Sequence, residues 1–173
     1  LRVQANPWLS GIAAVYVDLM RGVPLIVLSF FIYFGIPQMT GVRFSSATAG
    51  IMTLSLNAAA YVAEIVRGGI QAIDKGQMEA SRSLGLSYGK TMQKIILPQA
   101  IKLMIPSFIN QFVITLKDTS ILSVIGLVEL TQTGSVIIAR TYQFGSMWLI
   151  VGLMYLIVIT ALTRLSKRLE GGK

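Results

Sequence analysis

Long runs of apolar residues without charge are the feature that most limits what this chain can fold into. Three windows carry no charged residue and a fourth is interrupted only by Lys117-Asp118: 22–42, 44–63, 141–163 and 103–128. A helix needs about 20 apolar residues to cross the hydrocarbon of a bilayer. The sequence therefore predicts an all-α, polytopic membrane helix bundle with four spans, at about 22–36, 46–66, 104–128 and 145–163.

Composition supports this class and excludes several kinds of enzyme. Apolar residues make up 54% of the chain and charged residues 13%, and the mean hydropathy is +0.70. The runs are too long and too uniformly apolar for the strands of a membrane barrel. The chain has no Cys and no His, which excludes disulfides, zinc sites built on imidazole or thiolate, and Ser-His triads. The sequence implies no catalytic residue, no metal site and no cofactor.

The basic residues predict how the chain is oriented. Only Arg43 and Arg140 fall in the loops on one side of the predicted spans. The twelve on the other side are Arg2, Arg21, Arg67, Lys75, Arg82, Lys90, Lys94, Lys102, Arg164, Lys167, Arg168 and Lys173. Because Lys and Arg collect on the cytoplasmic side, we expect a multi-pass protein of the cytoplasmic membrane with its central loop and C-terminus in the cytoplasm. The net charge of +8 then reflects topology and contact with lipid, not nucleic-acid binding.

The central loop begins with the pattern of a helix start. Asp74 is a good N-cap, and Gln77 follows three residues later, as in a capping box. We expect a helix over 75–84, with Gly85 as a left-handed stop. Short helices of this size are marginal alone and need a docking surface.

A second short helix is predicted in the same loop. Ser87 caps it, and it extends to Leu97, where Pro98 interrupts the hydrogen-bond ladder. The two helices form an amphipathic hairpin, residues 75–98, that lies between long spans. One interpretation is a cytoplasmic docking element, and the alternative is an amphipathic loop on the membrane surface.

The residue spacing of this hairpin resembles a known family. Glu79-Ala80-Ser81, three residues, Gly85, nine residues, Ile95, one residue and Leu97-Pro98 resemble the EAA loop of permease subunits in ATP-binding-cassette importers. Ser81 replaces the second Ala, which is a small-for-small change. The resemblance implies that the loop is a coupling helix seated on a separate ATPase subunit. The residues it assigns to this coupling are Asp74, Glu79, Ala80, Ser81, Gly85, Ile95, Leu97 and Pro98.

Four further stretches resemble permeases for polar amino acids. They are 16–25 (YVDLMRGVPL), 31–37 (FIYFGIP), 61–70 (YVAEIVRGGI) and 116–126 (LKDTSILSVIG). The resemblance covers nearly the whole chain, which is expected to be a single transmembrane permease domain, 1–173. Members usually have five spans with the N-terminus outside, so the resemblance implies a further span upstream of Leu1.

One stretch of the hairpin comes close to a phosphate-binding motif. Residues 85–91 read GLSYGKT, but three residues separate the two glycines where a P-loop has four. No predicted strand precedes it and no acidic partner for magnesium follows. ATP hydrolysis is therefore expected on a separate subunit, and this chain is not expected to be an enzyme.

Polar residues within the spans are candidates for a translocation path. An ionised side chain at the centre of a membrane helix costs roughly 2.5–3.5 kcal/mol even on the lenient scale. Asn57, Tyr61 and Glu64 share one face of the second span by their spacing. The path candidates are Asn57, Tyr61, Glu64, Lys117, Asp118, Thr119 and Ser120, with Asn110 and Gln111 as secondary ones.

Structural readings of the same residues remain open at this point. Glu64 can pair with Arg67, three residues on. Lys117-Asp118 can form a structural ion pair, with Glu64 or across a subunit interface, or mark a helix that ends early. Asn57 and Tyr61 can hydrogen-bond to a neighbouring helix.

The resemblance implies an importer subunit that moves a polar amino acid by alternating access. The partners it implies are an ATPase subunit, a second permease subunit (identical or different), an extracytoplasmic solute-binding protein, the amino acid and membrane lipid. Two alternatives are an ion-coupled secondary carrier using Lys117, Asp118 and Glu64, and a scaffold subunit that transports nothing. The sequence contains no inverted repeat of the kind that supports a carrier.

Overall fold

The computed structural model describes residues 7–171, with side chains described for 8–166, and this part of the chain is helical with no strand. The charge positions Arg2 and Lys173 lie outside the described residues, as do the side chains of Lys167 and Arg168. The helices are α1 (Pro7–Gly22), α2 (Leu25–Phe30), α3 (Ile36–Thr40), α4 (Ser46–Gln71), α5 (Lys75–Ser83), α6 (Tyr88–Thr91), α7 (Leu97–Asp118), α8 (Leu130–Thr141) and α9 (Phe144–Gly171).

Three continuous helices are long and apolar enough to cross a membrane. They are Ser46–Gln71, Tyr88–Ile125 and Phe144–Ser166. They match the second, third and fourth predicted spans, and each extends beyond the predicted range at one end or both. The all-α membrane bundle predicted from the charge-free windows is confirmed.

The first predicted span differs from the expectation. The helix begins at Leu25, not at residue 22, and α2, a π-helical segment (Phe31–Gly35) and α3 continue it to Thr40. This segment is long and apolar enough to cross a membrane only together with α1, from which it is bent by 103°. The bend lies at Pro24, whose ψ of 138° is extended, because proline has no N–H to continue the ladder of α1.

The third span is also longer than predicted. The sequence predicts that Pro98 ends the hairpin's second helix, but the helix continues from Tyr88 through Pro98 to Ile125. A π-helical segment, Met92–Ile96, precedes the proline, and the Leu97 N–H donates to the Met92 carbonyl five residues earlier. This wider turn gives the proline ring room that a regular α-turn lacks. After Asp118 the chain tightens into a 3-10 segment, Thr119–Ile125, which ends at Gly126.

Helices α4 and α7 are in close contact near the hairpin end of α4. A Cβ added to Gly69 would lie 2.2 Å from Cγ of Met104, a side chain that is itself buried. The Met104 side chain therefore occupies the space that a Cβ at this position would need, while the nearest backbone atom of α7, the Ala100 carbonyl oxygen, lies 3.5 Å away. At the far end, a buried cluster joins α2, α4 and the 3-10 segment through Leu28, Ala49 and Leu122.

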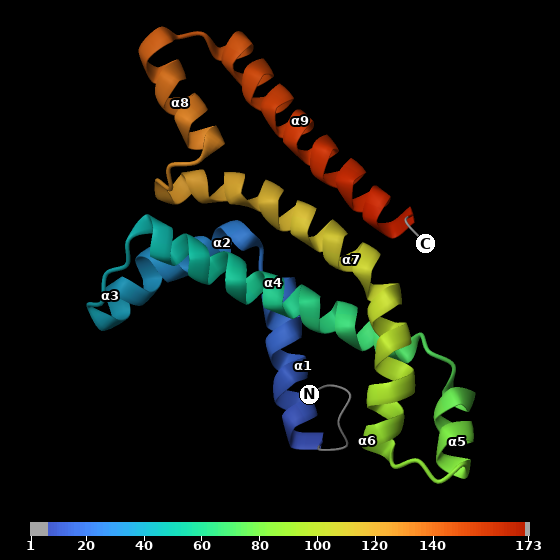
Figure 1. Ribbon diagram of the computed structural model, residues 1–173. Helices are drawn as coiled ribbons and strands as arrows, with labels where there is room; N and C mark the ends of the chain where they lie inside the picture. Colours follow the sequence, from blue (N-terminus) through green and yellow to red (C-terminus); the bar gives the residue numbers. More distant parts are fainter. Residues whose placement is uncertain (1–6, 172–173) are drawn as a thin grey trace.

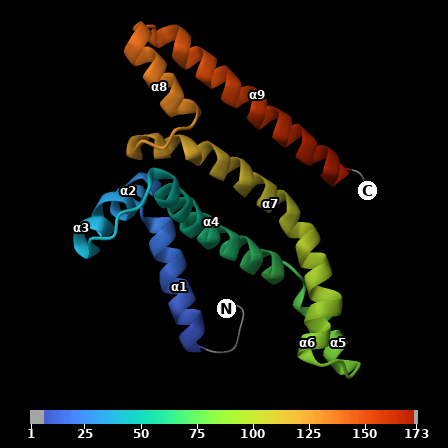
Figure 2. The same cartoon turned by 60° about the vertical axis from the view of Figure 1, so that its left-hand side comes forward.

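The arrangement of the helices places the hairpin and the C-terminus at the same end of the molecule. Both views show α4, α7 and α9 running side by side, with α5 and α6 beyond the end of α4 and the chain's C-terminus at that end of α9 (Figures 1 and 2). The α3–α4 and α8–α9 connections lie at the opposite end. Helix α8 has 12 residues, roughly 18 Å, and is too short to span a bilayer.

Candidate functional site

The hairpin of α5 and α6 is built by the turn residues that its sequence predicts. The Asp74 carboxylate accepts a hydrogen bond from the Gly76 N–H at 2.6 Å and caps α5. Gly85 has a φ of +84°, a left-handed conformation, directly after α5 ends. The Ser87 hydroxyl accepts from the Lys90 N–H and caps α6. The predicted start, stop and second cap are confirmed.

One part of the predicted capping box is wrong. The Gln77 side chain does not bond to the backbone at Asp74. Its amide instead exchanges two hydrogen bonds with the amide of Gln99, at 2.6 and 3.2 Å. The local pattern was overridden by a partner 22 residues away, which the sequence does not place beside α5.

The predicted coupling residues lie on different faces of the hairpin, some exposed and some buried. Glu79 and Ala80 are exposed, and so are Gly85 and Pro98. Ser81 is buried, and its hydroxyl donates to the Gln77 carbonyl at 2.6 Å. Its small size therefore serves packing within the hairpin, whereas the outward surface is formed around Glu79 and Ala80. Ile95 and Leu97 are half-buried on the adjoining helix.

A polar cleft of about 730 Å³ lies among the α1–α2 junction, α4 and α7. Its volume is in the range of sites for small organic ligands. It brings together four of the main path candidates, both secondary ones and two other polar residues: Asn57, Tyr61, Glu64 and Asp118, then Asn110 and Gln111, then Arg21 and Ser107. The polar stripe predicted on the second span therefore does face a cavity.

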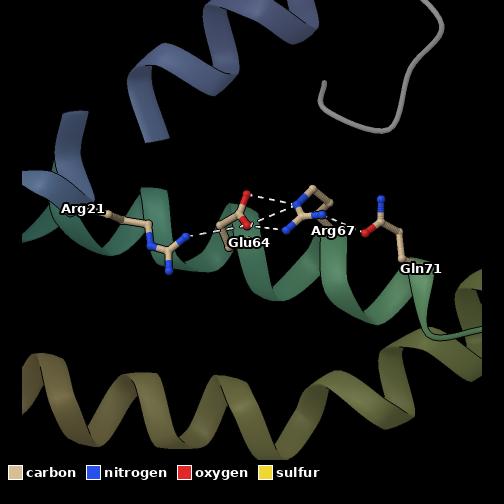
Figure 3. A network of polar contacts seen from close by, with 4 residues as sticks. All are labelled: Arg21, Glu64, Arg67 and Gln71. Atoms are coloured by element: carbon tan, nitrogen blue, oxygen red, sulfur yellow. Dashed lines mark hydrogen bonds and ion pairs between the residues drawn. The ribbon is translucent and has the colours of Figure 1, made fainter. Parts of the chain in front are cut away.

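Two lining residues of this cleft, Arg21 and Glu64, belong to a charged network with Arg67 and Gln71 (Figure 3). Arg67 holds the Glu64 carboxylate through both Nε and Nη2, with a shortest distance of 2.6 Å, and its Nη1 donates to Gln71. The Arg21 guanidinium approaches the same carboxylate at 3.7 Å from the end of α1. The predicted pair of Glu64 with Arg67 is confirmed, and the same carboxylate also lines the cleft.

The end of α1 is held against α4 by further polar contacts. The Asn57 amide donates to the Met20 carbonyl at 3.2 Å, and the Tyr16 hydroxyl donates to the Leu56 carbonyl at 2.7 Å. The Arg21 guanidinium carbon lies 5.4 Å from the centre of the Tyr61 ring, within cation–π range. Asn57 thus has both predicted roles, since it bonds to a neighbouring helix and lines the cleft.

The Lys117–Ser120 stretch does not act as one unit. Asp118 lines the polar cleft, whereas Lys117 and Ser120 line a separate cavity of about 290 Å³ against α9. Thr119 lines neither, and its hydroxyl donates to the Leu116 carbonyl. Adjacent helix residues point about 100° apart, and the four residues accordingly do not line one cavity in this chain. Within the described residues, neither charge of Lys117-Asp118 has an ion-pair partner, so the predicted structural pair with Glu64 does not form.

Two groups were missed by the sequence reasoning. Arg21 was counted only as a topology signal, although its place before Gly22-Val23-Pro24 puts it at the bend that borders the cleft. Glu129 caps α8 by accepting from the Thr131 and Gln132 N–H groups, and the Tyr155 hydroxyl donates to it at 2.9 Å. A Glu directly before a helix is a weak local sign of such a cap, and the contact with Tyr155 has no local sign.

Known proteins resemble this chain along almost its whole length. Residues 2–172 match the family described as binding-protein-dependent transport system inner membrane component. The arginine transport system permease protein ArtQ of Bacillus subtilis (strain 168) is 41% identical over 159 residues, 92% of this chain and 73% of that protein. The glutamine transport system permease protein GlnP of Escherichia coli (strain K12) is 40% identical over 165 residues, which cover 94% of this chain and 75% of that protein.

Solved structures agree with the sequence comparisons. The crystal structure of an amino acid ABC transporter with histidines superposes with a TM-score of 0.93 at 37% identity and covers 98% of this chain and 78% of that one. The match in fold includes the hairpin and the spans, because so little of this chain is left uncovered. This chain therefore belongs to the family of inner membrane components of binding-protein-dependent transport systems.

Proposed function

We propose that this chain is the transmembrane subunit of an ATP-driven importer that moves a polar amino acid across the cytoplasmic membrane. The observation that carries the proposal is the close match, at a TM-score of 0.93 and 37% identity, to a chain of an amino acid ABC transporter. Two relatives at about 40% identity are named for arginine and glutamine transport, which supports a polar amino acid as the substrate.

The exposed surface of α5 is the proposed contact with a separate ATPase subunit. Glu79 offers a charged group there, and Ala80 and Gly85 are small enough for close approach of the partner. The hairpin extends beyond the end of α4 at the same end as the C-terminus (Figure 1). The excess of basic residues at this end supports a cytoplasmic position for both, where ATP is available.

The polar cleft is the proposed section of the translocation path within this subunit. A zwitterion needs an anion partner for its ammonium group and a cation partner for its carboxylate. Asp118 and Glu64 offer the first and Arg21 the second, all on the same cleft. Asp118 has no partner of its own within the described residues, and it is half-buried. An unpaired carboxylate at membrane depth is costly, which supports a role in binding.

The transport cycle follows from these two sites. Two permease subunits pair around a central path, and two ATPase subunits bind their hairpins. Closure of the ATPases on ATP draws the hairpins together and turns the spans outward, where a solute-binding protein delivers the amino acid. Hydrolysis returns the spans inward. The cycle is energetic coupling between distant sites through a rigid element, and for binding it must act in both directions.

Transport by the reconstituted complex tests this proposal against its alternatives. The chain is purified with the ATPase that accompanies it, placed in proteoliposomes, and supplied with labelled arginine or glutamine and a binding protein. The proposal predicts uptake that requires ATP. Uptake without ATP would identify a secondary carrier, and no uptake of either amino acid under any condition would support a scaffold role.

A further inference from the structure

Helix α5 has few connections to the spans. It has nine residues, which is too short for stability alone. It packs on α6 and on the π-helical segment Met92–Ile96, both of which precede Pro98 in the chain. A force applied to the exposed side of α5 can reach α7 indirectly, through the connection 72–74 and α4. The direct route is the helix at Pro98, together with side-chain contacts that pass this proline.

The helix is weakened at this point, and it contains a second proline further along, Pro106. The π-helical segment replaces the regular bonding of one turn, and Pro98 has no N–H to donate. Sharp bends in helices occur at prolines and at π-turns, and here the two coincide. Without a further contact, the hairpin would bend relative to α7 at Pro98, and displacement of α5 would be absorbed there.

One pair of side chains crosses this weak point. Gln99 lies just after Pro98, and its Nε2 donates to Oε1 of Gln77 on α5 at 2.6 Å. Nε2 of Gln77 donates back to Oε1 of Gln99 at 3.2 Å. Both residues are half-buried. Among the described residues, no other side-chain hydrogen bond or ion pair links α5 to the helix that continues into α7.

The backbone of the π-helical segment fixes the orientation of this pair. Nε2 of Gln99 also donates to the Ile95 carbonyl at 2.8 Å, so both of its protons are used. Its carbonyl oxygen then faces Gln77. The side-chain amide of Gln99 is thus bonded to a backbone carbonyl that precedes Pro98, whereas the backbone of Gln99 follows Pro98. This hydrogen bond joins the two sides of the weak point.

We propose that the Gln77–Gln99 amide pair is a brace that makes α5 and α7 move as one body. This rests on the proposed function, because the brace matters only if a partner moves α5. Helix α7 forms a wall of the polar cleft through Ser107, Asn110 and Asp118, the last about 28 Å beyond Gln99 at 1.5 Å per residue. The brace carries displacement of α5 to that wall. Gln77 and Gln99 are positioning residues, with no contact to substrate or nucleotide.

Uncoupling of transport from hydrolysis is the expected result of breaking the brace. Gln77→Leu and Gln99→Leu each remove both hydrogen bonds, and in the reconstituted complex each should lower labelled amino acid moved per ATP hydrolysed by about tenfold. The double variant should be no worse than either single one. Gln93→Leu makes the same chemical change at an exposed position without a side-chain bond and should match the wild type. Pull-down of the ATPase should stay unchanged in all four.

A covalent replacement of the brace gives the second arm. The chain has no Cys, so Gln77→Cys/Gln99→Cys can be joined selectively by a short bifunctional thiol reagent. The linked complex should regain the transport-to-hydrolysis ratio that the unlinked one loses. If the Leu variants move as much amino acid per ATP hydrolysed as the wild type does, or if linking the two thiols restores nothing, the proposed brace is wrong. ATP-dependent transport by the wild type would still support the proposed function in that case. If the wild type moves neither probe with ATP, both proposals fail together.

Discussion

At the scale of the residue, the direction of each side chain decides which of the membrane charges can take part in transport. Asp118 and Lys117 are neighbours in sequence, yet they line different cavities. The sequence correctly predicted that charges here need a polar surrounding. It did not predict which cavity each faces, because that depends on the rotation of α7 against α4 and α9.

A matched pair of substitutions tests this division. Asp118→Asn removes the charge from the cleft, and a charged hydrogen bond is worth roughly 1.5–3 kcal/mol, so uptake should fall by about ten- to a hundredfold. Lys117→Gln removes a charge one residue away but outside the cleft, and uptake should change much less. Initial rates of labelled arginine or glutamine uptake in proteoliposomes measure both. Equal losses in the two variants would contradict the assignment of the cleft.

Two adjacent glycines in the last turn of α4 test its packing against α7. A Cβ at Gly69 would overlap Met104, whereas a Cβ at Gly68 meets nothing within 4 Å. Gly69→Ala should therefore lower the free energy of unfolding by about 1–3 kcal/mol, and Gly68→Ala should raise it by up to about 1 kcal/mol through helix propensity. Titration with denaturing detergent in micelles gives these values.

Two further results would bear on the same contact. Gly69→Ala combined with Met104→Ala should cost less than the sum of the two single changes, because the second change removes the overlap. Equal stability of Gly68→Ala and Gly69→Ala would show that α4 and α7 do not approach this closely.

At the scale of the element, local sequence signals correctly predicted the start and the stop of α5. They failed at prolines where the helix continues past the proline instead of ending there. The cap at Asp74 and the left-handed stop at Gly85 depend on adjacent residues only, so the sequence contains them in full. Pro98 and Pro37 each follow a five-residue π-helical segment that lets the helix continue. Such a segment exists because neighbouring helices support it, and no local pattern shows it.

A charge at the end of α5 tests the hairpin as a docking element. Gly85→Asp places a negative side chain at an exposed left-handed position, and it should abolish pull-down of the ATPase or its stimulation by substrate. Gly41→Asp is the control, because Gly41 has a φ of +75°, has open space around it and ends α3. Both variants should enter the membrane normally. Full ATPase binding and stimulation in Gly85→Asp would count against the docking role.

At the scale of the whole molecule, the order of the spans along the chain was the most predictable feature, because the length of the charge-free stretches sets it. The first span is the exception, since its 103° bend from α1 depends on Pro24 and on the contacts of α1 with α4. The cleft is a further exception, because it is assembled from three separate parts of the chain.

Much of the molecule's apolar surface is open in the single chain. Within an apolar stretch of 18 residues, only 6% of α9 is buried inside the chain, whereas 28% of the corresponding stretch of α4 is buried. A helix so little covered by its own chain must face lipid or another subunit, because an apolar surface of this size is unfavourable in water. This surface agrees with a multi-pass protein that works within a membrane assembly.

Crosslinking from the hairpin tests most directly whether α5 binds the ATPase that drives transport. Ala80 is exposed on α5, and since the chain has no Cys of its own, Ala80→Cys gives this subunit a single thiol at a known position. The account predicts a crosslink from this thiol to the ATPase subunit, at a yield that changes when ATP binds. Arg43→Cys, in the exposed α3–α4 connection, should give none. A thiol at position 80 that reacts only with reagents in the lipid phase or outside the cell, with no crosslink to an ATPase, would contradict the account.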